Sequence, residues 1–206
     1  MATSPDKNIP SQRSTGFTGE SVSPARLHSV KNIVLIGLMG AGKTTVGRRL
    51  ARRHSLPFLD TDHEIEQRCG ASVATIFDLE GEDGFRRRES RIIEEVMALT
   101  GHVITTGGGA ILAEENRKAL QQGFVIYLDA DPEHLWLRLK HDQTRPLLKQ
   151  SADPRTTLVA LHAKRDPLYR SIADMIVPTT RASVSVVMRA IEQGLTQAGF
   201  FQHEDA

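Results

Sequence analysis

Short apolar runs alternate along the chain with stretches whose apolar residues recur at helical spacing. The apolar runs predict strands buried on both faces, at residues 32–37, 57–60, 102–106 and 124–128, with a weaker one at 175–177. The helical spacing predicts helices at 44–54, around 64–68, at 84–100, after 113, from Pro132, before Pro167, and at 184–198. Strands that alternate with helices indicate an α/β fold with a parallel sheet covered on both faces.

The two ends of the chain differ from this pattern. Residues 1–30 are rich in Ser, Thr, Pro and Gly and have too little apolar surface to offset the entropy of ordering, so we expect a disordered N-terminal tail. They contain no apolar segment typical of a secretory signal. A plastid transit peptide is the alternative, since the segment is Ser-rich and basic, but it lacks a clear amphipathic helix. We assign residues 31–200 to one domain and 201–206 to a C-terminal tail.

A second break in the pattern lies between His141 and Arg155, where polar and charged residues and prolines dominate. Long loops in compact domains are often functional lids that close over a site. We therefore expect a mobile lid at about residues 142–154.

Composition limits the class of protein. The 206 residues include 39% hydrophobic and 25% charged residues, as in one soluble globular domain. The net charge of +1 gives no reason to expect a nucleic-acid or membrane partner, and no apolar run is long enough to span a bilayer. The single cysteine, Cys69, excludes an internal disulfide and fits a reducing compartment. We expect a cytoplasmic monomer.

Residues 37–44 (GLMGAGKT) match the phosphate-binding loop G-x-x-x-x-G-K-[ST], between a predicted strand and a predicted helix. Its glycines let backbone N–H groups and the helix N-terminus point at phosphates. Lys43 can reach the β- and γ-phosphates, and the Thr44 hydroxyl can bind Mg²⁺. The alternative is a glycine-rich turn with an exposed lysine, which the strand–loop–helix context disfavours. We predict an ATP site that includes Gly40, Ala41, Gly42, Lys43, Thr44 and Thr45.

Two aspartates end the second predicted strand, in the sequence FLDTD. Ligands of parallel sheets lie beyond the carboxyl ends of the strands, and a spacing of two in an extended segment puts both carboxylates on one side. One of Asp60 and Asp62 can support Mg²⁺ through water, and the other can orient or deprotonate an acceptor hydroxyl. The alternative is a helix N-cap, supplied by Thr61 or Asp62.

Three arginines and three glycines form two further candidates. Arg86, Arg87 and Arg88 point about 100° apart on a helix, so they form either a solvated basic face with Glu89 pairing locally, or a face from which one arginine binds an acceptor carboxylate. Gly107–Gly109 follow a strand and permit close approach of a ligand, although a tight turn also explains them.

Two further basic sites follow along the chain, one in the predicted lid and one before Pro167. Arg145, in the predicted lid, can stabilise the charge of phosphoryl transfer when the lid closes. Lys164 and Arg165 lie just before Pro167, where we expect the helix to end, and the helix dipole alone favours cations there.

Together these motifs resemble the shikimate kinase family. GLMGAGKTT, FLDTD, FRRRE, TTGGGA, TRPLL and AKRDPLYR occur in the order and at the spacing of that family, from about Lys31 to Gln193. The resemblance implies a three-layer P-loop kinase fold of the nucleoside monophosphate kinase type, with a five-stranded parallel sheet and a mobile lid. It implies ATP-dependent phosphorylation of shikimate to shikimate 3-phosphate, with Mg²⁺, in the biosynthesis of chorismate and aromatic amino acids.

Residue roles follow from the same resemblance. It places the substrate shikimate between Asp62, Arg86, Gly108 and Arg165, with Asp62 near the attacked hydroxyl. It assigns Arg145 to the lid over ATP, Arg181 to the neighbourhood of the adenine, and Asp60 to the water shell of a metal bound by Thr44. The catalytic set is then Lys43, Asp62 and Arg145.

Some alternatives stay open. Asp129 closes the strand FVIYLD as metal-binding aspartates often do, although the resemblance favours Asp60. Whether Asp62 acts as a base or as an orienting group is also undecided. The rival functions are another small-metabolite kinase, similar to gluconate kinase, and a nucleotide-dependent switch. The latter is disfavoured because the chain has no N-K-x-D motif.

Overall fold

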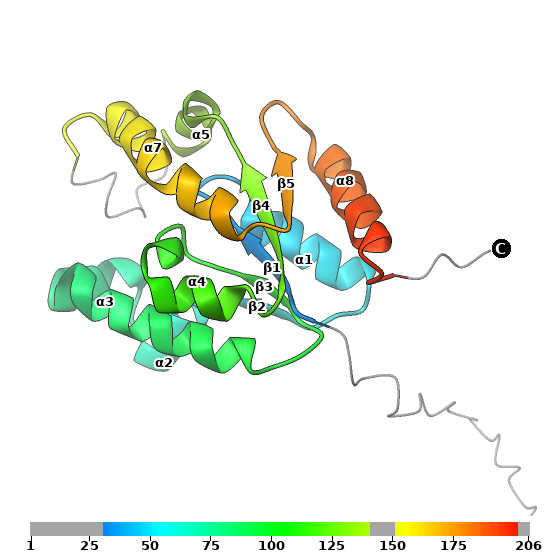
Figure 1. Ribbon diagram of the computed structural model, residues 1–206. Coiled ribbons are helices and arrows are strands. Elements are labelled where there is room, and N and C mark those ends of the chain that lie inside the picture. Colours follow the sequence, from blue (N-terminus) through cyan, green and yellow to red (C-terminus); the bar gives the residue numbers. More distant parts are fainter. Residues whose placement is uncertain (1–30, 141–150, 202–206) are drawn as a thin grey trace, which may run out of the picture.

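The structure is a computed structural model that describes residues 31–140 and 151–201 (Figure 1). Within them, five strands form one parallel sheet in the order β2-β3-β1-β4-β5. The strands are β1 (Ile33–Ile36), β2 (Phe58–Asp60), β3 (Val103–Thr105), β4 (Phe124–Asp129) and β5 (Met175–Pro178). The predicted α/β class, the five strands and their parallel arrangement are confirmed.

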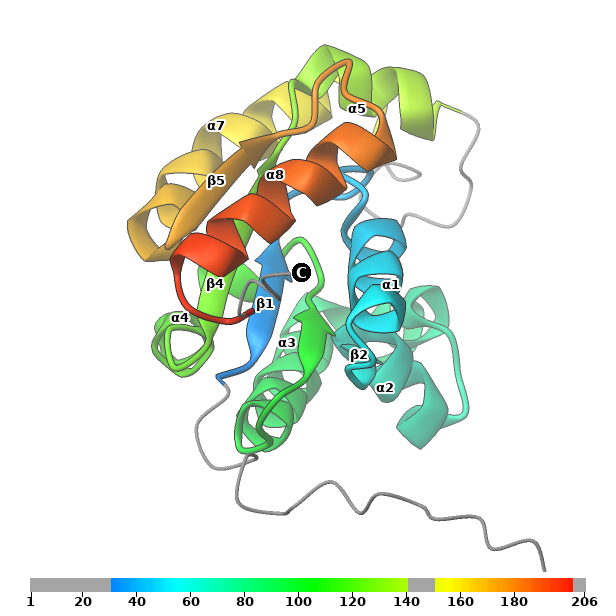
Figure 2. The ribbon, with the colours of Figure 1, turned by 90° about the vertical axis from the view of Figure 1, so that its right-hand side faces the viewer.

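Helices cover both faces of the sheet. They are α1 (Lys43–Arg53), α2 (Thr61–Cys69), α3 (Val73–Met97), α4 (Glu114–Leu120), α5 (Pro132–Leu139), α7 (Pro154–Ile172) and α8 (Val184–Gln197), with a 3₁₀ turn, η2, at Ala110–Leu112. Helices α1 and α8 pack side by side on one face, and α3, α4 and α7 lie along the other (Figures 1 and 2). This is the three-layer arrangement expected when right-handed crossovers join parallel strands.

The strand order sets the position of the site. The central strand, β1, pairs with β3 on one side and β4 on the other, and its four residues are all buried. Because all five strands run the same way, the segments that follow β1, β2 and β3 emerge at one edge of the sheet. The phosphate-binding loop, the FLDTD aspartates and the three glycines therefore meet there.

Helix α3 begins earlier than the hydrophobic pattern predicted. It starts at Val73, capped by the Ser72 side chain, and Gly81 interrupts it with a φ of 70° and a ψ of −177°. The pattern at 84–100 identified only the segment after this kink. The earlier segment was missed because its charged and exposed residues leave a weak apolar period, with Ile76 its only fully buried side chain.

The prediction that a helix ends at Pro167 is wrong. Helix α7 continues through Pro167 to Ile172. A proline inside a helix removes one backbone hydrogen bond, here the one to the carbonyl of Ala163. Beyond the proline, Tyr169 and Ile172 are buried, so packing against the sheet holds the last turn in place despite that loss.

Several predictions lie outside the described residues. They are the disordered tail at 1–30, most of the lid at 142–154 together with Arg145, and the C-terminal tail apart from Phe201. The Phe201 ring stacks on His54 with ring centroids 3.8 Å apart. Among the residues that the structure describes, no helix is long and apolar enough to cross a membrane.

Candidate active site

The phosphate-binding loop joins β1 to α1 as the sequence predicted. Gly42, which caps α1, has a φ of 97°, a left-handed conformation that favours glycine. The Lys43 ammonium group lies under the loop and donates hydrogen bonds to the carbonyl oxygens of Gly37 and Leu38, at 2.8 and 2.9 Å. The lysine is buried rather than exposed, so the alternative of a turn with a solvated lysine does not hold.

Asp60 stands between the loop and the neighbouring strand. Its Oδ2 accepts hydrogen bonds from Thr44 Oγ1 at 2.7 Å and from Thr105 Oγ1 at 2.9 Å. Its Oδ1 accepts from the backbone N–H groups of Asp62 and His63, so Asp60 also caps α2. The alternative of a cap at Thr61 or Asp62 is therefore wrong, because β2 passes directly into α2, which already begins at Thr61.

The two aspartates serve different parts of the site. We expected an extended segment with both carboxylates on one side, but Asp62 lies in the first turn of α2. Asp60 faces Thr44, whereas Asp62 lines a separate pocket. The change from strand to helix at Thr61 thus directs the Asp60 carboxylate towards the phosphate-binding loop and the Asp62 carboxylate towards a second binding space.

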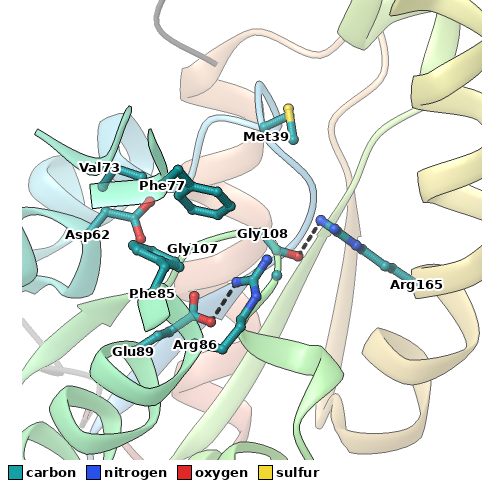
Figure 3. Close-up of a pocket in the computed structure, with 11 residues that line it drawn as sticks. Met39, Asp62, Val73, Phe77, Phe85, Arg86, Glu89, Gly107, Gly108 and Arg165 are labelled. Atoms are coloured by element: carbon teal, nitrogen blue, oxygen red, sulfur yellow. Dashed lines mark hydrogen bonds and ion pairs between the residues drawn. The ribbon is translucent and has the colours of Figure 1, made fainter. Parts of the chain in front are cut away.

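That second space, the acceptor pocket, lies beside the phosphate-binding loop between α2, α3, α7 and the glycines after β3 (Figure 3). One part of its wall is apolar and the other is charged. Its lining consists of Met39, Asp62, Val73, Phe77, Phe85, Arg86, Glu89, Gly107, Gly108, Gly109 and Arg165. The pocket brings together all four residues that the sequence assigned to the substrate.

Arg86 is the one tandem arginine that reaches the acceptor pocket. Its Nη1 donates to Glu89 Oε2 at 2.6 Å, and its Nη2 donates to Glu82 Oε1 at 2.9 Å. Its side chain is 18% exposed. Arg87 and Arg88 lie on the solvent side of α3, where Arg88 pairs with Glu80. The helix therefore divides the three arginines into one site residue and two surface residues.

Glu89 is the most deeply buried charged group of the site. Its side chain is 0% exposed, and burial raises its pKa from 4.5 to about 7, while the Arg86 guanidinium opposes that rise. The sequence indicated only a local partner for an arginine at this position. A signal for its burial was present but not used: Glu89 lies four residues after Phe85 and four before Ile93, on the apolar face of the helix.

The three glycines fit tightly against the charged groups. A Cβ on Gly107 would lie 2.6 Å from Asp62 Oδ1 and 2.7 Å from Glu89 Oε1, and a Cβ on Gly109 would overlap the Arg86 guanidinium. Real Cβ contacts are essentially never this close. The glycines therefore serve the approach of charged side chains as well as a turn.

Arg165 approaches the pocket from α7. Its Nη1 donates to the Gly108 carbonyl at 3.0 Å (Figure 3). The Tyr169 hydroxyl donates to the same oxygen at 2.5 Å. Arg165 is 3% exposed, and burial lowers its pKa from 12.5. Within the described residues its Nε has no hydrogen-bond partner. Arg165 is thus a site cation and not merely a cation favoured by a helix end.

A further pocket, here called the nucleotide pocket, is lined by residues of the phosphate-binding loop. Its lining combines loop residues with α5, the β5–α8 loop and α8: Gly40, Ala41, Gly42, Thr45, Val46, Arg138, Thr179, Ala182, Val184 and Val187. Arg138 joins these parts by donating to the carbonyls of Gly40 and Thr179, at 3.1 and 3.0 Å. The sequence analysis missed Arg138, since a basic residue in the last turn of a helix is common.

Arg181 lies in the same β5–α8 loop, with a left-handed φ of 57°. Its Nε contacts His134 Nε2 at 3.3 Å, and its neighbour Ala182 lines the nucleotide pocket. Its role near the adenine, implied by the resemblance, stays a prediction.

Asp129 is engaged elsewhere. Its Oδ2 accepts from Arg170 Nη2 at 2.6 Å, and Arg170 also binds Asp166. With His162, these two aspartates form a cluster at the end of β4. By contrast, Asp60 contacts Thr44 directly, so the geometry favours Asp60 as the aspartate beside a metal at the phosphate-binding loop.

Comparison with known proteins agrees with this geometry. The family model described as shikimate kinase matches residues 39–196. The chain belongs to the shikimate kinase family. A shikimate kinase from Ralstonia nicotianae is 53% identical over 172 residues, which are 83% of this chain and 90% of that relative.

Solved structures point to the same family. A shikimate kinase from Acinetobacter baumannii, solved in complex with shikimate, is similar with a TM-score of 0.80 and 41% identity, covering 84% of this chain and 97% of that one. A gluconokinase from Sinorhizobium meliloti has a TM-score of 0.54 at 18% identity, covering 82% and 93% of the two chains. This second likeness is one of fold alone.

Proposed function

We propose that this chain transfers the γ-phosphate of ATP to a hydroxyl group of shikimate and so forms shikimate 3-phosphate, in the biosynthesis of chorismate and aromatic amino acids. The observation that carries the proposal is the acceptor pocket beside the phosphate-binding loop, where Arg86 and Arg165 lie with Asp62. Two guanidinium groups suit an acceptor that carries a carboxylate, and a carboxylate suits its hydroxyl. Relatives named shikimate kinase, about 50% identical over most of the chain, support it.

The protein residues divide the work. Arg86 and Arg165 hold the acceptor carboxylate, and the Gly108 backbone lines the same wall. Asp62 orients the attacking hydroxyl and accepts its proton late, because the neighbouring guanidinium groups favour the ionised carboxylate. The apolar side chains of Phe77, Phe85 and others cover the ring of the acceptor and exclude water.

On the other side of the transferred phosphoryl group, backbone N–H groups of the phosphate-binding loop and the helix N-terminus bind the phosphates of ATP. Lys43 exchanges its present carbonyl contacts for phosphate oxygens and stabilises the charge that develops on them. The ATP site further includes Gly40, Ala41, Gly42, Thr44, Thr45 and Arg181. Arg145, outside the described residues, remains a prediction from the sequence.

Thr44 and Asp60 fit a magnesium ion. Mg²⁺ prefers oxygen ligands and keeps several waters, so it takes few protein ligands. The Thr44 hydroxyl and the Asp60 carboxylate lie 2.7 Å apart at the loop. We assign Thr44 as a direct ligand and Asp60 as a ligand through water. When bound, the ion neutralises charge on the β- and γ-phosphates.

A panel of acceptors tests the proposal. The full chain with MgATP should form ADP rapidly with shikimate and slowly with gluconate or with no acceptor, and phosphorus NMR should show one phosphate ester. Lys43→Ala should lose most of this turnover while keeping its fold. Equal ADP formation with and without shikimate would indicate a nucleotide-dependent switch, and faster turnover of gluconate would indicate the rival kinase.

The remaining expectations concern partners. We expect a monomer that acts on ATP and shikimate, with no nucleic-acid or membrane partner and a cytoplasmic location. Gel filtration with light scattering tests the first of these directly.

A further inference from the structure

Glu89 is a buried carboxyl group for which the phosphoryl transfer described above has no use. Its Oε2 accepts from Arg86 at 2.6 Å. Its Oε1 is buried and, in the described part of the chain, has no hydrogen-bond partner. A Cβ placed on Gly107 would lie within 2.7 Å of both Glu89 Oε1 and Asp62 Oδ1, so the two oxygens face each other across that glycine. A carboxylate with a bare oxygen near a second carboxylate is a natural place for a proton.

The charged groups around Glu89 come from three helices. Arg86 and Glu82 lie on its own helix α3, Asp62 lies on α2, and Arg165 and Tyr169 lie on α7. Glu82 is about half exposed, and Tyr169 is neutral because burial raises its pKa, although the neighbouring Arg165 opposes that rise. The interior of the pocket therefore holds two guanidinium groups and two carboxyl groups.

Acceptor binding changes this balance. The proposed function, on which this step rests, adds a third carboxylate that draws on the same two guanidinium groups. The acceptor also displaces water from the pocket, which weakens the solvation of every charge inside it. Three carboxylates cannot be compensated by two guanidinium groups in a buried space unless one carboxylate is neutralised.

We propose that Glu89 takes up one proton from solvent when the acceptor carboxylate binds Arg86, and returns it when the product leaves. The proton lies on the bare Oε1, while Oε2 keeps its contact with Arg86. Glu89 thereby acts as a positioning residue. Its carboxylate form pairs strongly with Arg86 in the free protein, and its protonated form pairs more weakly, so that the Arg86 guanidinium is available to the acceptor carboxylate.

The direction of the pH dependence follows. In the free protein the pKa of Glu89 is about 7, and the added negative charge of the acceptor raises it further. Between these two values, acceptor affinity should fall about tenfold per pH unit as pH rises, because binding consumes one proton there. Nucleotide binding, which does not add a carboxylate to the acceptor pocket, should not share this dependence.

Calorimetry measures the proton directly. Shikimate is titrated into the full chain without nucleotide at about pH 7.5, in buffers of different ionisation enthalpy, and the slope of observed enthalpy against buffer enthalpy gives the protons taken up. We expect an uptake that approaches one proton as pH rises from about 7. Zero uptake, or proton release, with measurable binding would overturn the proposal.

Two variants assign the proton. Glu89→Gln mimics the protonated carboxyl group, so it should bind shikimate without proton uptake and with little pH dependence. Glu82→Gln removes the exposed partner of Arg86 and should retain the uptake of the wild-type protein. Persistent uptake in Glu89→Gln would place the proton elsewhere and overturn the proposal.

The wild-type titration also separates this inference from the proposed function. If shikimate does not bind at all, the proposed function fails. If it binds and no proton is taken up, only the role of Glu89 fails. The wild-type result stands even if Glu89→Gln does not fold.

Discussion

The Thr44 hydroxyl donates a hydrogen bond to the Asp60 carboxylate across 2.7 Å, and so links the phosphate-binding loop to the end of β2. This contact joins the two groups that we assign to magnesium. It also holds the carboxylate in place, because the same oxygen accepts from Thr105 on the adjacent strand. Asp60 is thus positioned by both neighbours.

Replacement of Asp60 by Asn should raise the Mg²⁺ concentration needed for half-maximal turnover by about tenfold, the lower range for loss of a group that orients metal ligands. Asp129→Asn is the matched control, since Asp129 also ends a strand but pairs with Arg170. Magnesium titrations of turnover measure both. A shift in the Asp129 variant alone would reverse our assignment.

Arg86→Lys should raise the Michaelis constant for shikimate by about tenfold or more and leave that for ATP nearly unchanged. Lysine keeps the charge but cannot form the planar, two-pronged contact with a carboxylate. Arg88→Lys, on the solvent side of the same helix, is the control and should have little effect. Steady-state kinetics with each substrate varied would contradict the assignment if both constants rose equally in Arg86→Lys.

Asp62→Asn should lower the rate of the chemical step by roughly 10²-fold, the range typical of a lost acid–base group. The amide keeps the size of the side chain and one acceptor oxygen, so ATP affinity should change little. Single-turnover transfer measures this step apart from product release. An unchanged chemical step with weaker shikimate binding would make Asp62 a substrate anchor only.

Glu89→Gln should become more stable relative to the wild-type protein as pH rises. Burial raises the pKa of Glu89 from 4.5 to about 7, so its contribution to stability is present below about pH 4.5 and is lost as pH rises through about 7. The difference in free energy of unfolding should move by about 3 kcal/mol in favour of the variant between pH 4.5 and 8. Urea unfolding at several pH values tests this, and a pH-independent difference would contradict the raised pKa.

Local signals predicted the sheet and one half of the site. The strand–loop–helix frame around Lys43 depends on neighbours in the chain, and the buried strands show as continuous apolar runs. Asp62, Arg86, Gly108 and Arg165, expected from motifs, do line one pocket. The family resemblance selected these four positions, because Arg86 and Arg165 lie inside α3 and α7, where helical spacing alone does not choose among neighbouring cations.

Other features depend on contacts between distant segments. In the sequence, Pro167 predicts the end of a helix, yet the packing of Tyr169 and Ile172 stabilises the helix beyond it. Arg138 contacts carbonyls 98 and 41 positions away, and no local pattern marks such a residue. The helical spacing places Glu89 on the buried face of α3, but its position beside Asp62 and Gly107 depends on segments distant in the chain.

The glycines after β3 have a consequence for redesign of this pocket. The atoms nearest to a Cβ at 107 or 109 are the side-chain ends of Asp62, Glu89 and Arg86, so a substitution there displaces the charged groups of the pocket first. A library randomised at these two positions should therefore yield folded proteins that melt normally but have lost the acceptor. Substitutions intended to admit new substrates should instead be made on the apolar wall, at Met39, Val73 and Phe77. There the shape of the pocket can change while Asp62, Arg86 and Arg165 keep their positions.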